Sequence, residues 1–336
     1  MRDTLSAYQR LQAAPDSFDF FAALRRLECA YPDKPRIGTS HRAQDDAVRF
    51  GQQPSLAFEG AALHSFTPGA DGAPDKLQVN FFGLMGANGP LPVHLTDYVR
   101  DRLRNANDPT LASFLDLFHH RLIALFYRAW ASAQPAVSLD RPDTDRFADY
   151  IASLIGTGVA SLQQRDAAPD YAKLHYAGRL SAQSRNAEGL AAILNGFFKL
   201  PVQVEQFVGH WMTLPADGLC RLRSGPDAER LGVSTVLGTR VWNRQHKFRL
   251  VIGPVDAGQL TQMLPGGVSV ERLVAWVRNY AGLEYDWDVR LIVKKQALPP
   301  LRLGRGARLG WTTWLSGRPP PQDDSQLRFS PLQHAA

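Results

Sequence analysis

Asp116, His119 and His120 are the first residues whose types and spacing could do chemistry, as metal ligands or as acid–base groups. They lie in a stretch with helical periodicity, in which successive side chains point about 100° apart. The two histidines therefore cannot both face one ion, and the HExxH spacing of zinc enzymes is absent. Pairing with neighbouring polar groups is the simpler interpretation, and an unrecognised hydrolase stays an alternative.

Two further segments offer weaker candidates for ligand binding. Residues 140–149 contain four aspartates but lack the central Gly and the terminal Glu of a calcium loop, so we expect helix capping there. Residues 83–89, GLMGANG, could present backbone amides to phosphate, but they lack the GK[ST] end of a P-loop and do not open a helix. Since GxSxG and SxxK are also absent, we predict no catalytic residue, no cofactor and no metal site.

The charge balance is moderately basic, with 38 Lys and Arg against 32 Asp and Glu. Only seven of the basic residues are Lys, and the Arg residues are scattered rather than gathered in a compact patch. A nucleic-acid-binding protein is therefore an alternative function. Cys29 and Cys220 have no metal-ligand spacing, and neither a signal peptide nor an 18-residue apolar run is present. We expect a cytoplasmic protein that spans no membrane.

The candidate residues would be positioned by short elements in the first half of the chain. Residues 17–31 carry apolar side chains at helical spacing, and residues 77–81 alternate as a strand does. That strand runs into an apolar Gly/Pro loop, FFGLMGANGPLP, at 81–92. Thr96 can cap a short helix at 97–105.

A long helix is predicted over residues 109–133, where Asp108-Pro109 forms a start and Gln134-Pro135 a stop. Its apolar arc consists of Leu111, Phe114, Leu115, Phe118, Leu122, Leu125 and Phe126, widened by Ile123 and Trp130. More than half of the circumference is apolar, so the helix should be central or should bury a second face against another protein. Arg121 and Arg128 share one side and are expected to pair with carboxylates of this chain or of a partner.

The second half predicts a mixed lobe of helices at 187–198 and 270–280 and strands at 202–208, 231–242, 248–252 and 283–294. The fold class is therefore α+β, with two mixed helix and sheet lobes around the long apolar central helix and extended loops. We expect an N-terminal lobe at 1–165, a C-terminal lobe at 166–318 and a flexible tail at 319–336.

The ordered motifs of the chain resemble those of one bacterial family. They are FDFFAALRRL (18–27), RIG (36–38), VRF (48–50), FGLMG and GPLP (82–92), FLDLFHHR (114–121), FYRAW (126–130), YAG (176–178), LGTRV (237–241), FR (248–249) and LGW (309–311). In this order, over nearly the whole chain, they resemble TssG, the ImpH/VasB family of type VI secretion baseplate subunits. The loop at 67–76 and the Pro-rich tail match no pattern of that family.

The resemblance implies a structural subunit of a baseplate wedge rather than an enzyme. TssG-like subunits associate with two copies of TssF, engage trimers of TssK, and lie near TssE and the VgrG hub. Such a wedge would hold its partners in a fixed geometry so that the sheath assembles on a completed platform. It would work in the cytoplasm, docked at the inner-membrane complex through its partners, and the family supplies no catalytic residue and no cofactor.

Exposed apolar loops, wide apolar helices and tryptophans are features of obligate protein interfaces. On that basis the candidate structural or partner-interface residues are Phe81, Phe82, Leu84, Met85, Pro90, Leu91, Pro92, Arg121, Arg128, Trp130, Trp311 and Trp314.

Overall fold

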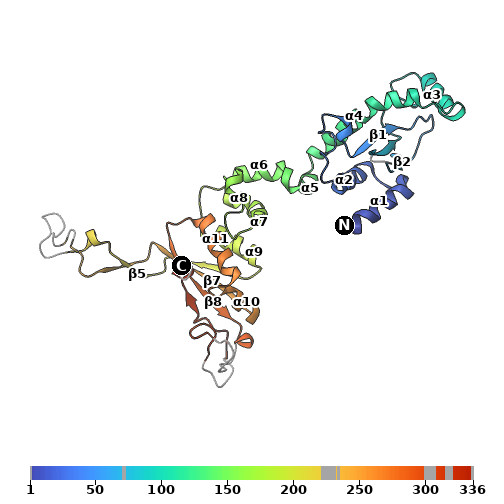
Figure 1. Cartoon of the computed structure of the whole chain (residues 1–336). Coiled ribbons are helices and arrows are strands. Elements are labelled where there is room, and N and C mark those ends of the chain that lie inside the picture. Colours follow the sequence, from blue (N-terminus) through green and yellow to red (C-terminus); the bar gives the residue numbers. More distant parts are fainter. Residues whose placement is uncertain are drawn as a thin grey trace. The chain divides into compact units, whose positions relative to one another are not determined.

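The computed structural model describes residues 2–69, 73–220, 232, 235–298, 308–314 and 321–333. The chain divides into two compact units, Met1–Asp149 and Tyr150–Ala336. Each unit combines helices with small β-sheets and has a buried apolar core of its own, which confirms the predicted α+β class (Figure 1). The boundary falls after Asp149 rather than at 165, since Ile155 already packs against the core of the second unit.

The first unit holds a three-stranded sheet covered by helices. Its strands β1 (Val48–Gln52), β2 (Leu63–Thr67) and β3 (Asp75–Val79) have the order β1-β3-β2, with β1 parallel and β2 antiparallel to β3. Its helices are α1 (Arg2–Ala13), α2 (Phe20–Ala30), α3 (Val93–Asn105), α4 (Thr110–Ser132) and α5 (Pro135–Leu139). The helix α6 (Arg146–Leu154) spans the boundary between the units.

The predicted long helix is present as α4, within one residue of the expected ends. It packs on β1, and among the described residues one of its faces is buried while the other is exposed. The expectation of an apolar helix central to two lobes is therefore not met: α4 is an element of the first unit, and its apolar arc faces outward. The face that packs in the first unit instead carries His119, His120, Ile123, Ala124, Tyr127 and Ala131.

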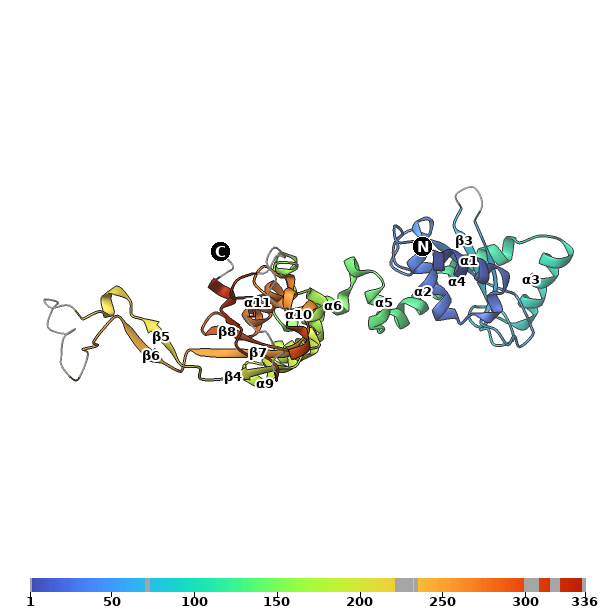
Figure 2. The ribbon, with the colours of Figure 1, turned by 90° about the horizontal axis from the view of Figure 1, so that it is seen from below.

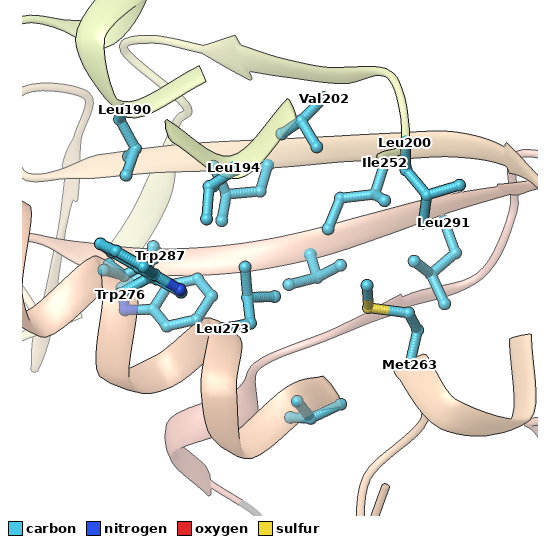
Figure 3. Close-up of a cluster of buried hydrophobic side chains, with 14 of the residues drawn as sticks. Leu190, Leu194, Leu200, Val202, Ile252, Met263, Leu273, Trp276, Trp287 and Leu291 are labelled. Carbon is cyan, nitrogen blue, oxygen red and sulfur yellow. The ribbon is translucent and has the colours of Figure 1, made fainter. Parts of the chain in front are cut away.

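The second unit is built on a four-stranded sheet with the order β4 (Val202–Glu205), β7 (Lys247–Val255), β8 (Asp286–Val293) and β9 (Arg328–Phe329). Strands β7 and β8 are parallel and the outer pairs are antiparallel. One face of the sheet is covered by α9 (Ala187–Phe198), α10 (Ala257–Met263) and α11 (Val268–Ala281), while α7 (Asp170–His175) and α8 (Ala177–Leu180) precede them. Figure 3 shows Leu194, Leu273 and Trp276 packed toward Ile252 and Leu291 of the sheet.

Strands β5 (His210–Thr213) and β6 (Arg240–Asn243) form a separate two-stranded antiparallel sheet, which we call the arm. Figures 1 and 2 both show the arm extending away from the four-stranded sheet of its own unit. The sequence expectation paired residues 231–242 with 248–252; instead β6 pairs with β5, and β7 lies between β4 and β8. Part of the expected strand at 231–242 lies outside the described residues.

The C-terminal residues 321–333 differ from the flexible tail that was expected from residue 319. Strand β9 pairs with the edge of β8, and Val293 forms a further bridge with Asp324. Leu327 and Phe329 are buried in the core of the second unit. The burial of these two apolar side chains accounts for the difference, because it holds the segment against the sheet, where the backbone of β9 pairs with the edge of β8. Residues 319–320 and 334–336 lie outside the described part of the chain.

Candidate partner-binding surface

Helix α4 exposes its most apolar side. Along that side lie six large apolar side chains, which we call the α4 stripe, with exposed fractions from 38% to 66%: Phe114, Leu117, Phe118, Leu122, Leu125 and Phe126. The opposite side is buried and contains His119, His120, Ile123, Ala124, Tyr127 and Ala131. The helix thus has two apolar sides, and among the described residues the first unit covers the one that bears the histidines.

His120 ties α4 to the neighbouring strand and loop. Its Nδ1 accepts a hydrogen bond from the backbone N–H of Phe50 at 3.2 Å, so its proton is on Nε2, which donates to Oδ2 of Asp46 at 2.8 Å. Burial lowers the pKa of His120, against the opposing effect of the Asp46 carboxylate. The neutral ring therefore fits this position.

In His119 the two ring nitrogens have the opposite roles, with Nε2 as the acceptor and Nδ1 as the donor. Its Nε2 accepts from the backbone N–H of Leu84 at 3.0 Å, and its Nδ1 donates to Oδ1 of Asp116 at 3.1 Å. Asp116 also accepts from the backbone N–H of Gln52 and pairs with Lys76 at 3.1 Å. Burial would raise the pKa of Asp116, but the hydrogen bond from His119 and the charge of Lys76 together lower it.

Both histidines therefore use both ring nitrogens for internal hydrogen bonds, and both are buried. A general base must reach the proton that it abstracts from a substrate. The pairing with neighbours that the sequence predicted is what the structure shows for Asp116, His119 and His120. This geometry speaks against a hydrolase built on these three residues.

An aromatic cluster joins the α4 stripe to the Gly/Pro loop. Phe82 stacks on Phe126 with ring centroids 5.3 Å apart, and Phe81 lies 5.9 Å from the same ring. Phe81 also contacts Phe20 at 5.0 Å. Because Phe126 belongs to both groups, the stripe and the start of the loop form one continuous apolar surface, which we call the α4 surface.

The other predicted loop residues differ in exposure. Pro90 and Pro92 are exposed, Leu84 and Leu91 are half-buried, and Met85 is buried beneath the loop. Pro90 and Pro92 can therefore contact a partner directly, whereas Met85 serves the internal packing of the loop.

The other predicted interface residues of the long helix, Arg121, Arg128 and Trp130, make contacts within the chain. Arg128 pairs with the Glu28 carboxylate at 2.5 Å and donates to the carbonyl of Ile37, and Arg121 donates to the carbonyl of Ser40 at 3.2 Å. Trp130 stacks on Phe21 with centroids 4.5 Å apart. The carboxylate pairing expected of Arg128 is thus intramolecular.

The two tail tryptophans lie against the second unit's own core. Trp311 contacts the ring of Phe329 at 5.5 Å, and Trp314 Nε1 donates to Oδ2 of Asp324 at 2.7 Å. Both side chains are only partly buried. Their first role is to hold the C-terminal strand on the sheet.

Two tryptophans of the arm are exposed and are not among the residues that the sequence predicts for partner contacts. Trp211 of β5 lies opposite Trp242 of β6, with ring centroids 5.4 Å apart, and these side chains are 60% and 53% exposed. The signal that could have found them is one tryptophan in each of two short segments, second in HWMT and third in RVWN, which antiparallel pairing places opposite each other. Their pairing could not be seen without the register of the two strands.

One family model and two solved structures match this chain. The family described as "Type VI secretion, TssG" matches residues 14–316. The chain is similar to a chain in a solved structure described as "The baseplate complex from the type VI secretion system", with 25% identity, 97% of this chain and 94% of that chain covered, and a TM-score of 0.66. No curated protein sequence matches.

A second solved structure resembles the chain in fold. It is described as "Structure of the type VI secretion system TssK-TssF-TssG baseplate subcomplex revealed by cryo-electron microscopy", and it aligns with 23% identity over 64% of this chain and 92% of that chain, at a TM-score of 0.55. The family match extends over both units of the fold. The chain therefore belongs to the TssG family of type VI secretion proteins.

Proposed function

We propose that this protein is a structural subunit of the type VI secretion baseplate and that it binds TssF through the α4 surface. The observation that carries the proposal is the exposure of six large apolar side chains on one helix of a TssG-family chain. A similar solved structure is described as a TssK-TssF-TssG subcomplex, which supports TssF and TssK as partners. The role is geometric: the subunit holds its partners in a fixed arrangement.

The shape of the stripe favours a helical partner segment. Phe114, Phe118, Leu122 and Leu125 are spaced by four, four and three residues, so they form one ridge along α4. Removal of such side chains from water contributes about 25 cal/mol per Å² of apolar surface. When two helices pack, the ridges of side chains on one helix fit into the grooves between the side chains of the other, so an amphipathic helix of the partner could cover this ridge.

The arm is the second candidate contact, and we assign it to TssK. An isolated two-stranded sheet is marginally stable in water, so an arm with two exposed tryptophans gains stability when a partner covers it. We expect Trp211→Ala to reduce the capture of TssK by the full chain while the capture of TssF stays unchanged. Equal loss of both partners would contradict this assignment.

The remaining partner proposals rest on the family alone. They are two copies of TssF per subunit, TssK as trimers, and positions near TssE and the VgrG hub, in the cytoplasm at the inner-membrane complex. The subunit contributes no catalysis in this proposal. Among the described residues no helix combines the length and apolar character that a membrane span requires.

Co-purification with the cognate TssF tests the proposal. Leu117→Asp and Leu122→Asp each place a charge on the stripe, and we expect either change to abolish capture of TssF. Leu283→Asp is the matched control, because Leu283 is equally apolar and 82% exposed but lies in the second unit. Retention of TssF by both stripe variants at the wild-type level would refute binding through α4.

A further inference from the structure

Three successive backbone amides of the Gly/Pro loop are held by side chains from three different elements. The N–H of Leu84 donates to His119 Nε2 of α4 at 3.0 Å, and the N–H of Met85 donates to Gln52 Oε1 of β1 at 2.9 Å. The N–H of Gly86 donates to Thr96 Oγ1 of α3 at 3.0 Å. The loop is thus anchored to two helices, α3 and α4, and to the sheet.

The three acceptors are buried. His119 and Thr96 have no exposed surface, and Gln52 retains 4% of its own. Gln52 also donates from Nε2 to the carbonyl of Met85 at 2.6 Å, so this one amide side chain satisfies both backbone groups of Met85. A buried N–H without an acceptor is costly, so removal of any of these side chains would force the loop to open to water.

Close packing restricts the loop to one path. Gly83 has a φ of +155°, and a Cβ added there would lie 2.1 Å from Gln52 Oε1. A Cβ at Gly89 would lie 2.6 Å from the carbonyl oxygens of Leu84 and Met85. Residues 84–86, which we call the anchored segment, are thus preceded by Gly83 and followed by Gly89, and both positions require glycine because neither has space for a side chain.

The anchored segment lies between the residues that face outward. Phe81 and Phe82 precede it and join the α4 surface, and Pro90 and Pro92 follow it and are exposed. The anchors hold these side chains in place before any partner arrives. A surface that is ordered in advance loses less conformational entropy on binding, which increases affinity.

We infer that His119, Gln52 and Thr96 are positioning residues that preset the Gly/Pro loop for docking of TssF. The inference rests on the proposed function, because it requires TssF to contact the α4 surface. None of the three side chains touches the partner in this scheme. They act through the backbone of residues 84–86.

Thr96→Val in the full-length chain is the sharpest test. Valine keeps the shape of threonine but cannot accept a hydrogen bond from Gly86. We expect faster hydrogen–deuterium exchange at residues 84–86 and about five- to tenfold weaker binding of TssF, the effect of one lost hydrogen bond. Thr96→Ser, which restores the hydroxyl, is expected to restore both slow exchange and affinity.

Two controls separate positioning from general stability. Ile123→Val removes one methylene from the buried side of α4 without touching the loop anchors, so it is expected to lower the melting temperature but not the affinity for TssF. Thr67→Val makes the same chemical change at an exposed site of β2 and is expected to change neither. Should Thr96→Val fail to fold, Thr96→Ala removes the same acceptor.

These measurements test the positioning role of Thr96 separately from the proposed binding of TssF. Faster exchange at 84–86 with unchanged affinity for TssF would overturn the positioning role and leave TssF binding intact. Unchanged exchange would also overturn it, because the amide of Gly86 would then not depend on Thr96. Failure of the wild-type chain to bind TssF would instead refute the proposed function.

Discussion

At the level of single residues, two of the arginines have a structural role, because they bind the carbonyls at the ends of two helices. Arg36, which follows α2, donates to the carbonyls of Val137 and Ser138 at the end of α5. Arg141, which follows α5, donates in turn to the carbonyls of Glu28 and Tyr31 at the end of α2. Each side chain thus satisfies the terminal carbonyls of the other helix, and a positive charge at a helix C-terminus is favourable.

The guanidinium fork is needed for this arrangement, which makes Arg141→Lys informative. A lysine ammonium cannot reach several carbonyls in a plane at once, so we expect a loss of about 1–3 kcal/mol in the free energy of unfolding of the first unit. Urea unfolding measures the loss. Arg42→Lys, at an exposed site, is the control. Equal midpoints for both variants would show that the fork is dispensable.

His120 should make stability depend on pH. Its folded pKa lies below the ordinary value of 6.5 because burial disfavours the charged ring. The unfolded chain therefore binds a proton first, and stability that is present above pH 6.5 is lost as the pH falls toward the folded pKa. We expect the wild type to lose more stability between pH 7.5 and 5.5 than His120→Gln, measured by urea midpoints. If the urea midpoints of the wild type and of His120→Gln fell equally over this pH range, His120 would not be the source of the pH dependence.

At the level of elements, the two sides of α4 have different roles, one in internal packing and one in the proposed contact with a partner. Its histidine side supports β1 and the Gly/Pro loop, and its stripe is left to the solvent in the single chain. Large exposed apolar surfaces on a lone chain promote association. We therefore expect the isolated protein to self-associate when its partner is absent.

Charge on the stripe should relieve that association. We expect the triple change Leu117→Glu, Leu122→Glu and Leu125→Glu to lower self-association of the isolated chain, since all three side chains face solvent. The melting temperature should change by little for the same reason. Size-exclusion chromatography with light scattering measures the first effect and calorimetry the second. A large fall in melting temperature would mean that the stripe is part of the fold.

At the level of the whole molecule, the net charge of +6 raises the question of nucleic acid. Several arginines bind internal groups: Arg36 and Arg141 hold helix ends, Arg128 pairs with Glu28, and Arg249 pairs with Asp288 at 2.5 Å. Such side chains are not free to neutralise phosphates. We expect no retention on DNA at about 0.15 M salt. Binding that weakens steeply with rising salt would favour the alternative function.

Local signals along the chain predicted the longer helices well, but not the short helices α5, α7, α8 and α10. The helix at 187–198 has the predicted ends, and α4 agrees within one residue, because caps, prolines and apolar spacing act over a few neighbouring residues. The strand expected at 283–294 is β8, which begins only at Asp286. Its alternate residues Trp287, Val289, Leu291 and Val293 are buried as the alternation predicts, whereas Leu283 and Tyr285 precede the strand and are exposed. Thr96 shows the limit of such signals: it was expected to cap a helix, but α3 begins at Val93 and the hydroxyl holds Gly86 instead.

By itself, the sequence determined the α+β class, the main helices, the family and the apolar character of the segment from 81 to 130. Only the tertiary structure decided which side of α4 is buried, which partners His119, Arg128 and Trp314 have, and that β9 closes the edge of β8. The physical reason is that spacing shows an apolar side but not what covers it. Contacts between residues far apart in the chain decide whether a side packs on its own sheet or stays available to a partner.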